Sequence, residues 1–172
     1  MPAPRLTEET KQKAEQGDAD AQMQTAVFYM SPGQNKDEAI RWLRKAAEQN
    51  HVKAQALLGA SYVQGNGVPQ DSAEGVKWLQ KAGNSGDAQA QNALGFCYAS
   101  GQGVAVNHAL ALKWYAKAAE QRDPQAQFNL GDCYRLGLGV EVDLDEAARW
   151  YRRAAAANYP PALKMLQDLS RK

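Results

Sequence analysis

Charge of one sign, long apolar runs and reactive side chains are all scarce in this sequence. Lysine and arginine number 20 against 19 aspartates and glutamates, so no excess charge attracts a polyanion and no basic patch indicates nucleic-acid binding. No apolar run approaches the roughly 18 residues of a membrane span, and residues 1–16 lack the apolar segment of a secretory signal. We therefore expect no membrane insertion and a cytoplasmic location, or a periplasmic one if a natural signal has been removed.

Histidine and cysteine are limited to two residues each, which leaves little material for metal binding or catalysis. Neither His51 nor His108 has a cysteine, histidine or carboxylate at metal-ligand spacing. Cys97 or Ser100 could be combined with His108 as nucleophile and base, but a glycine-rich turn separates them and no third group is evident. We therefore predict surface histidines, no enzyme activity, no metal and no cofactor.

The sequence does contain a strict internal period. Its four tryptophans lie 36 residues apart, at Trp42, Trp78, Trp114 and Trp150. Other columns share this spacing: glycines at 59, 95 and 131, tyrosines at 62, 98 and 134, and G-x-G-V elements at 65–68, 101–104 and 137–140. Such a period is typical of repeat proteins, in which each repeat buries its apolar face against its neighbours.

Each repeat is predicted to consist of two helices joined by the glycine-rich turn. In the first, the A helix, Leu58, Gly59 and Tyr62 share one face, and the glycine lets a neighbouring helix approach closely. In the second, the B helix, Trp78 and Ala82 share the apolar face. The predicted N-caps of the B helices are Asn35, Asp71, Asn107 and Asp143. Three of these caps are expected to form capping boxes, with Glu38, Glu74 and Glu146.

The two ends of the array differ from its middle. The first repeat has a turn three residues shorter, with Ser31-Pro32-Gly33 in place of the G-x-G-V element. We predict a single solenoid domain over residues 1–172, in which four repeats lie between two helical caps. The ranges are 5–17 for the first, B-type helix, then 18–52, 53–88, 89–124 and 125–158 for the repeats, and 159–172 for the capping segment with its helix over 160–170. The apolar side of that last helix is expected to contain Leu163, Met165, Leu166 and Leu169.

Residues 18–158 closely resemble the Sel-one-like repeat family, a branch of the tetratricopeptide-type αα repeats. The matching residues include Ala88-Gln89-Ala90-Gln91, Leu94-Gly95, Tyr98, Gly101-Gln102-Gly103-Val104, Trp114-Tyr115 and Ala118-Ala119. The resemblance implies an all-α fold, an αα-hairpin solenoid whose right-handed superhelix has the A helices on its concave face. It also implies an adaptor role in bacterial signalling, secretion, envelope or protein-quality pathways, and some relatives resemble immunity proteins that neutralise secreted toxins.

Four features of the repeat are given a structural interpretation. The G-x-G triplets resemble a phosphate loop, but no Lys-Ser or Lys-Thr follows them and no strand precedes them, which indicates turns. The tryptophans resemble a stacking platform, but alanines lie at their i+4 positions, which indicates core packing. Asp143, Asp145 and Glu146 resemble a cation site, but negative charge is favourable at a helix N-terminus. Equivalent positions on stacked helices lie ~8–10 Å apart, beyond the roughly 7 Å reach of a disulfide, so Cys97 and Cys133 are predicted to be free thiols.

If the A helices follow tetratricopeptide geometry, the variable positions between the repeated ones line the concave groove. These positions include Met23, Val27, Met30, Lys53, Ala56, Ala60, Val63, Gln64, Asn92, Phe96, Phe128, Asp132, Arg135 and Leu136. The set is more apolar than a surface that faces only water, and Phe and Arg are enriched in protein interfaces. The alternative is that Phe96 and Phe128 fold back against neighbouring helices.

We therefore predict a bacterial, non-enzymatic protein-protein interaction module, an adaptor or scaffold that is monomeric in isolation and binds a protein or peptide in this groove. Five A-type helices ~9 Å apart and ~18 Å long give roughly 700 Å², near the ~800 Å² that each partner contributes to a standard interface, so a helix or an extended peptide would fit. The alternative is an immunity or inhibitor protein that captures a secreted toxin enzyme.

Overall fold

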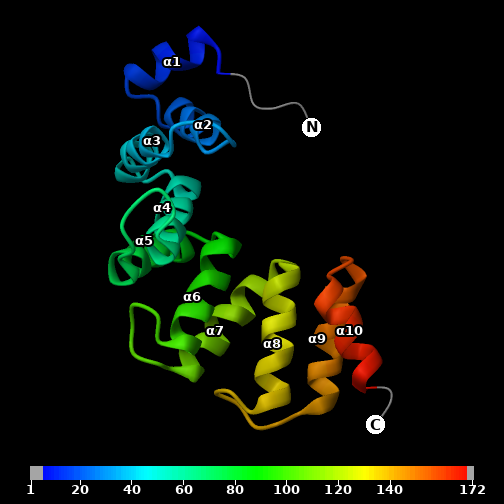
Figure 1. Ribbon diagram of the computed structural model, residues 1–172. Helices are drawn as coiled ribbons and strands as arrows, with labels where there is room; N and C mark the ends of the chain where they lie inside the picture. The colour runs from blue at the N-terminus through cyan, green and yellow to red at the C-terminus, as the bar shows by residue number, and fades with distance from the viewer. Residues whose placement is uncertain (1–5, 170–172) are drawn as a thin grey trace. The chain divides into compact units, whose positions relative to one another are not determined.

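The computed structural model describes residues 6–169, which contain ten helices and no strand (Figure 1). The A helices are α2 (Ala19–Tyr29), α4 (Val52–Gln64), α6 (Ala88–Ser100) and α8 (Pro124–Leu136). The B helices are α3 (Lys36–Glu48), α5 (Ser72–Asn84), α7 (His108–Glu120) and α9 (Leu144–Ala156). Helices α1 (Glu8–Glu15) and α10 (Pro160–Leu169) precede and follow the repeats. The predicted all-α repeat fold is confirmed, whereas residue 5 of the first predicted helix and residues 170–172 of the capping segment lie outside the described part.

The chain forms two compact units, which we call the N-terminal unit (residues 6–85) and the C-terminal unit (residues 86–169). In the N-terminal unit, α2 packs on α3 and α4 on α5, while α1 packs on α2 and α3 on α4. In the C-terminal unit, α6 packs on α7 and α8 on α9, while α7 packs on α8 and α9 on α10. Each unit therefore contains two A–B hairpins and one terminal helix.

The A and B helices of a hairpin approach closely at the glycine of the A helix. A Cβ placed on Gly59 would lie 2.8 Å from Cγ of Leu79, and one placed on Gly131 would lie 2.6 Å from Cε1 of Tyr151. Real Cβ atoms show no such contacts, so only glycine fits without displacing its neighbour. The predicted role of this glycine column is confirmed.

After α4, α6 and α8, the turn from A to B begins with a left-handed glycine that ends the A helix, for example Gly101 with φ +76°. The predicted B-helix caps are confirmed, because each cap side chain accepts a hydrogen bond from a first-turn N–H. The backbone N–H groups of Asp71, Asn107 and Asp143 donate instead to the carbonyls of Tyr62, Tyr98 and Tyr134, at 2.8–3.0 Å. An N–H group at the start of the B helix and a carbonyl near the end of the A helix, which have no partner within their own helices, thus bond to one another.

This exchange makes the capping-box prediction wrong at Asp71 and Asp143, since their N–H groups already have a partner in the preceding helix. The glutamates of all three predicted capping boxes form ion pairs with the basic residue three positions later. The pairs are Glu38–Arg41 at 3.2 Å, Glu74–Lys77 at 3.0 Å and Glu146–Arg149 at 3.0 Å.

The turn from B to A depends on a column of aspartates that the sequence analysis missed. Asp18, Asp87 and Asp123 cap α2, α6 and α8, and the 36-residue spacing of Asp87 and Asp123 was the signal that could have found this column. His51 takes this place at α4, where its Nδ1 accepts a hydrogen bond from the Ala54 N–H at 3.2 Å. Its Nε2 lies 3.2 Å from a carboxylate oxygen of Asp20, and the side chain is 17% exposed. His51 therefore serves as a helix cap and is partly buried, which the prediction of a surface histidine did not anticipate.

The tryptophans lie at the edge of the core, and only Trp42 is buried. The other three are partly exposed, because a helix of 3.6 residues per turn places the next residue, not the tryptophan, deepest against the A helix. These deeper residues are Leu43, Leu79, Tyr115 and Tyr151. Each tryptophan ring forms a cation–π contact with the basic residue three positions later. These residues are Lys45, Lys81, Lys117 and Arg153, whose charged groups lie 4.1–4.4 Å from the ring centroids. The prediction of tryptophans as core residues is correct for Trp42, and Trp78 and Trp150 pack against the core while remaining partly exposed.

Helix α10 covers α9 with Met165, Leu166 and Leu169, as predicted. Leu163 is 46% exposed and is the exception. Ala162, Met165, Leu166 and Leu169 are related as i, i+3, i+4 and i+7 and form the stripe of α10 that faces α9. Leu163 lies outside this stripe.

Candidate partner-binding surface

The predicted groove positions lie on the A helices, except Met30, which directly follows α2. We call the part of these positions that reaches solvent the A-helix face, and each unit has its own. Five are exposed: Val27, Lys53, Gln64, Phe96 and Leu136. Six are partly exposed: Met23, Met30, Ala60, Phe128, Asp132 and Arg135. Ala56, Val63 and Asn92 are buried, and a buried side chain offers a partner little surface.

In the N-terminal unit, most of the apolar groove positions contribute to the core. Met23 and Met30 pack against the buried cluster of α2, α3 and α4. Val63 approaches α5 so closely that a Cβ on Gly75 would lie 2.7 Å from its Cγ2. Val27 is 39% exposed and is the apolar groove position that this unit presents to solvent.

In the C-terminal unit, Phe96 of α6 and Leu136 of α8 are each 52% exposed. Phe128 of α8 instead stacks against Tyr151 and Tyr159, with ring centroids 5.3 and 5.6 Å apart. The folded-back alternative is therefore correct for Phe128 and wrong for Phe96. Burying a half-exposed phenylalanine removes about 100 Å² of apolar surface from water, which stabilises a complex by about 2.5 kcal/mol.

The charged groove residues of this unit neutralise one another. Arg135 donates from Nε and Nη2 to the same carboxylate oxygen, Oδ1 of Asp132, at 3.0 and 2.7 Å. The Tyr151 hydroxyl donates to that oxygen at 2.8 Å and accepts from Arg135 Nε at 3.1 Å. Burial, together with the hydrogen bond to Asp132, raises the pKa of Tyr151. The hydroxyl therefore remains a donor, and the cluster holds Asp132 and Arg135 in fixed positions.

A side-chain hydrogen bond links α6 to α8. Nδ2 of Asn129 donates to Oδ1 of Asn92 at 2.9 Å. Asn129 was not among the predicted positions, and no signal indicated it, because the equivalent position of the preceding repeat is Ala93. Phe96 lies one turn after Asn92 on α6, and Leu136 lies two turns after Asn129 on α8.

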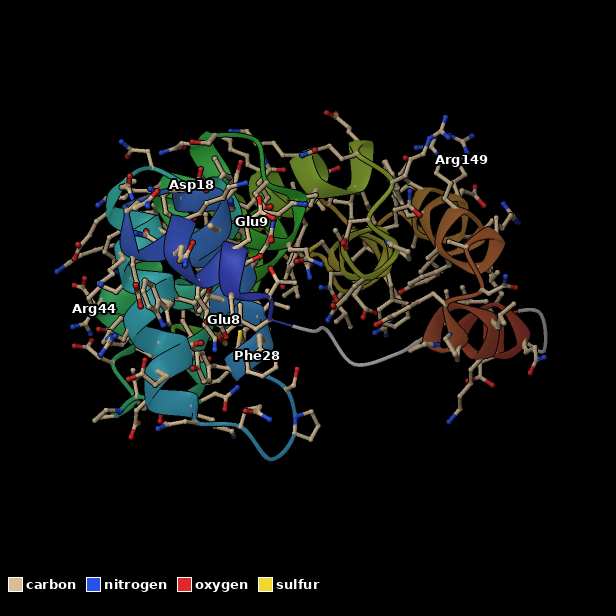
Figure 2. All side chains as sticks on the ribbon, turned by 90° about the horizontal axis from the view of Figure 1, so that it is seen from above. Glu8, Glu9, Asp18, Phe28, Arg44 and Arg149 are labelled. Atoms are coloured by element: carbon tan, nitrogen blue, oxygen red, sulfur yellow. The ribbon has the colours of Figure 1, made fainter. Side chains whose placement is uncertain are left out.

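Charge is distributed unequally between the two kinds of helix. The four A helices of the repeats contain only Asp20, Lys53, Asp132 and Arg135 as charged residues. The B helices α3, α5 and α9 have acidic residues in their first turn and basic residues in their last, which complements the helix dipole. Arg44 of α3 donates from Nη2 to the Tyr62 hydroxyl at 2.6 Å, and Arg149 of α9, labelled in Figure 2, donates from Nη1 to Glu146 at 3.0 Å. The A-helix face is accordingly a nearly uncharged surface.

No group of three or more histidine, cysteine, aspartate or glutamate side chains within residues 6–169 is arranged to hold a metal ion. Over the same residues, no helix has the length and apolar composition that crossing a membrane requires. Cys97 and Cys133 are free and buried, and burial raises the pKa of each thiol to about 11.

Comparison with solved structures identifies proteins that are similar over most of this chain, two of which are described first. A protective antigen present in uropathogenic Escherichia coli strains, which displays an SLR fold, is 40% identical with a TM-score of 0.89, and the match covers 94% of this chain and 35% of that one. A Sel1 repeat protein from Oxalobacter formigenes is 36% identical with a TM-score of 0.86, and the match covers 91% of this chain and 64% of that one. This chain therefore spans less than two thirds of the length of either protein. A search of curated proteins gave no match.

The Sel1 repeat profile matches residues 19–51, 52–87, 88–123 and 124–159. Helicobacter pylori cysteine rich protein B, 24% identical with a TM-score of 0.61 over 79% of this chain and all of that one, shares the fold. Sel1 repeat proteins are typically non-catalytic and generally mediate protein–protein interactions. By its four matched repeats, this chain belongs to the Sel1 repeat family.

Proposed function

We propose that this chain is a non-enzymatic adaptor that binds a protein or peptide partner on its A-helix face. The observation that carries the proposal is the exposure of Phe96 and Leu136 on neighbouring A helices, each 52% exposed, where the repeat offers no structural use for them. Aromatic residues at the centre of an interface contribute much of its binding energy. Val27 is an exposed apolar residue on an A helix of the N-terminal unit.

Three proteins test the proposal: the wild type, a Phe96→Glu, Leu136→Glu variant, and a matched control with Val106→Glu and Val142→Glu. The control valines are 55% and 62% exposed but lie in the A-to-B turns, so they receive the same chemical change outside the A helices. Phe128 is left unchanged, because a glutamate there would enter the cluster with Tyr151 and Tyr159. Circular dichroism melting verifies that all three proteins are folded.

Each protein is immobilised, exposed to a native bacterial lysate, and the captured proteins are quantified by mass spectrometry. We expect a partner that the wild type and the turn control retain and that the A-helix variant loses by at least tenfold. Equal retention by the A-helix variant would contradict the proposal. The partner's identity separates the adaptor role from the immunity role, since a secreted toxin enzyme captured one to one would indicate an inhibitor.

A further inference from the structure

The A-to-B turns of the C-terminal unit expose apolar side chains outside the A-helix face. We define the turn edge as Val106, Glu141, Val142, Leu144 and Asp145. Its three apolar members are 55%, 62% and 54% exposed, and its two acidic members are exposed as well. We infer that the turn edge binds a basic segment of a partner protein, in which lysine or arginine stands next to apolar residues. This inference goes beyond the proposed function, because it assigns a second binding surface.

The position directly before the B-helix cap differs between the two units. It is occupied by Gln34 and Gln70 in the N-terminal unit and by Val106 and Val142 in the C-terminal unit, and all four side chains are exposed. Gln70 belongs to a turn of the same length as those of the two valines, so the repeat does not require an apolar residue there. Exposed apolar residues that the fold does not need are typical of a surface that a partner covers.

The position directly after the cap shows the same contrast. Lys36, Ser72 and His108 begin the other B helices, whereas the apolar Leu144 begins α9. Its exposure shows that it contributes little to the core of the unit. Leu144 and Val142 are therefore two neighbouring apolar residues at places where the other hairpins have polar or less apolar ones.

The two turns of the C-terminal unit lie against each other. A Cβ placed on Gly139 would lie 2.8 Å from the backbone nitrogen of Ala109. The turn over residues 137–143 therefore packs on the start of α7, which directly follows the turn over residues 101–107. Both turns are on the lower side of this unit in Figure 1. Val106 thus belongs to the same edge of the unit as Val142 and Leu144.

The charge of the turn edge decides the chemistry of the partner. Residues 136–148 contain four acidic residues and no lysine or arginine. Among the residues that the structure describes, Glu146 is paired with Arg149, but no ion pair involves Glu141, Asp143 or Asp145. The helix dipole favours negative charge in the first turn of α9, whereas Glu141 lies before the cap and gains nothing from it. The acidic character of the edge therefore exceeds what the helix requires.

A basic and partly apolar segment satisfies both properties of the edge. Acidic and apolar residues alternate over residues 141–145, and all five are exposed. Lysine and arginine cover apolar surface with their aliphatic stems while their charged ends reach a carboxylate. Apolar side chains of the segment remove Val142 and Leu144 from water, and charge complementarity selects basic segments over acidic ones. Binding should accordingly weaken as salt is added.

The test uses N-acetylated, C-amidated nonapeptides composed only of Gly, Ser, Val, Leu, Lys and Arg, screened on the full chain by fluorescence polarisation at low salt. The tightest member is resynthesised with glutamine in place of its basic residues, and separately with serine in place of its apolar ones. One protein variant, Val142→Gln, Leu144→Ser, carries the residues that the second repeat has at these positions, so the fold accommodates them. A second variant, Glu141→Ala, Asp145→Ala, removes the charges and carries the alanines that the third repeat has there.

Two matched controls accompany these variants. Leu163→Ser removes an exposed leucine from α10, and Asp37→Ala removes an exposed acid at the position of α3 that corresponds to Asp145. Circular dichroism melting verifies that every protein is folded. Sedimentation velocity of the chain without peptide shows whether a second copy covers the edge instead.

We expect Val142→Gln, Leu144→Ser to weaken binding about tenfold or more and each resynthesised peptide to lose at least as much. Glu141→Ala, Asp145→Ala should weaken binding about fivefold or more at low salt and by less than about twofold in 0.5 M salt, and both controls should change it by less than about twofold. Binding by no library member, equal binding of the glutamine peptide, equal binding by Val142→Gln, Leu144→Ser, or self-association that this variant abolishes would overturn the inference.

The outcome is separate from that of the proposed function. Phe96 and Leu136 are unchanged in all of these proteins, and the turn edge contains no residue of the A helices. A partner of the A-helix face should therefore still be captured by Val142→Gln, Leu144→Ser, whether or not the turn edge binds a basic segment.

Discussion

Replacing Gly131 with alanine should destabilise the C-terminal unit, although alanine is the better helix former. The new methyl carbon would lie 2.6 Å from Cε1 and 2.8 Å from Cδ1 of Tyr151. Tyr151 cannot easily give way, because it is fully buried and its hydroxyl is hydrogen-bonded to Asp132 and Arg135. Overpacking costs about 1–3 kcal/mol and loss of the hydroxyl bonds about 1 kcal/mol more, against a gain of about 1 kcal/mol in helix propensity. We expect the free energy of unfolding to fall by about 1–3 kcal/mol.

The measurement is urea unfolding followed by circular dichroism, applied to a double-mutant cycle with Tyr151→Ala. In the Tyr151→Ala background the methyl group meets no ring, so Gly131→Ala should become neutral or stabilising by up to about 1 kcal/mol. The cycle corrects for the loss of stability that Tyr151→Ala causes by itself. The reasoning is refuted if Gly131→Ala has the same effect in both backgrounds, or if the single variant is more stable than the wild type.

Two further predictions concern the backbone and the thiols. Arg122 has φ +66° at a position where Gly86 stands in another repeat, so Arg122→Gly should stabilise the chain by about 1 kcal/mol in urea unfolding, whereas Arg122→Ala should give no gain. Because the thiols of Cys97 and Cys133 have pKa values near 11 when folded and 9.0 as reference, they should react slowly with iodoacetamide at pH 8 until urea is added. The unfolded thiols lose their protons first, so stability should decrease as the pH rises from 9 to 11, and a constant midpoint over that range would contradict the assigned burial.

The helices and turns were predictable because they depend on short-range chemistry that the repeat displays several times. Gly101 ends an A helix in the left-handed conformation, which a residue without a Cβ adopts freely, and Asp71 caps a B helix with a side chain of the right length. Repetition turned each of these weak signals into a strong one. The capping boxes failed for a different reason, since the backbone N–H of Asp71 finds the Tyr62 carbonyl, a partner supplied by the preceding helix and not by local sequence.

The candidate surface was less predictable, because a position in the repeat indicates the helix face on which a residue lies but not how exposed its side chain is. Phe96 and Phe128 both belong to the predicted groove, yet Phe96 is half exposed and Phe128 packs on Tyr151 and Tyr159. Tyr159 lies beyond the last complete A–B pair, so no periodicity could associate it with Phe128. Asn129 was missed because its bond to Asn92 requires the two residues on adjacent A helices to occur together, which happens once among the repeats.

The sequence by itself therefore determined the helices, the caps of the B helices, the glycine contacts and the membership of the repeat family, since all of these follow from residue types at fixed local spacing. Only the tertiary structure decided which groove positions are exposed, which charges neutralise one another and which asparagines of different A helices are hydrogen-bonded. The physical reason is that exposure and hydrogen-bond satisfaction are properties of all neighbours together, and those neighbours come from other helices that the local pattern does not specify.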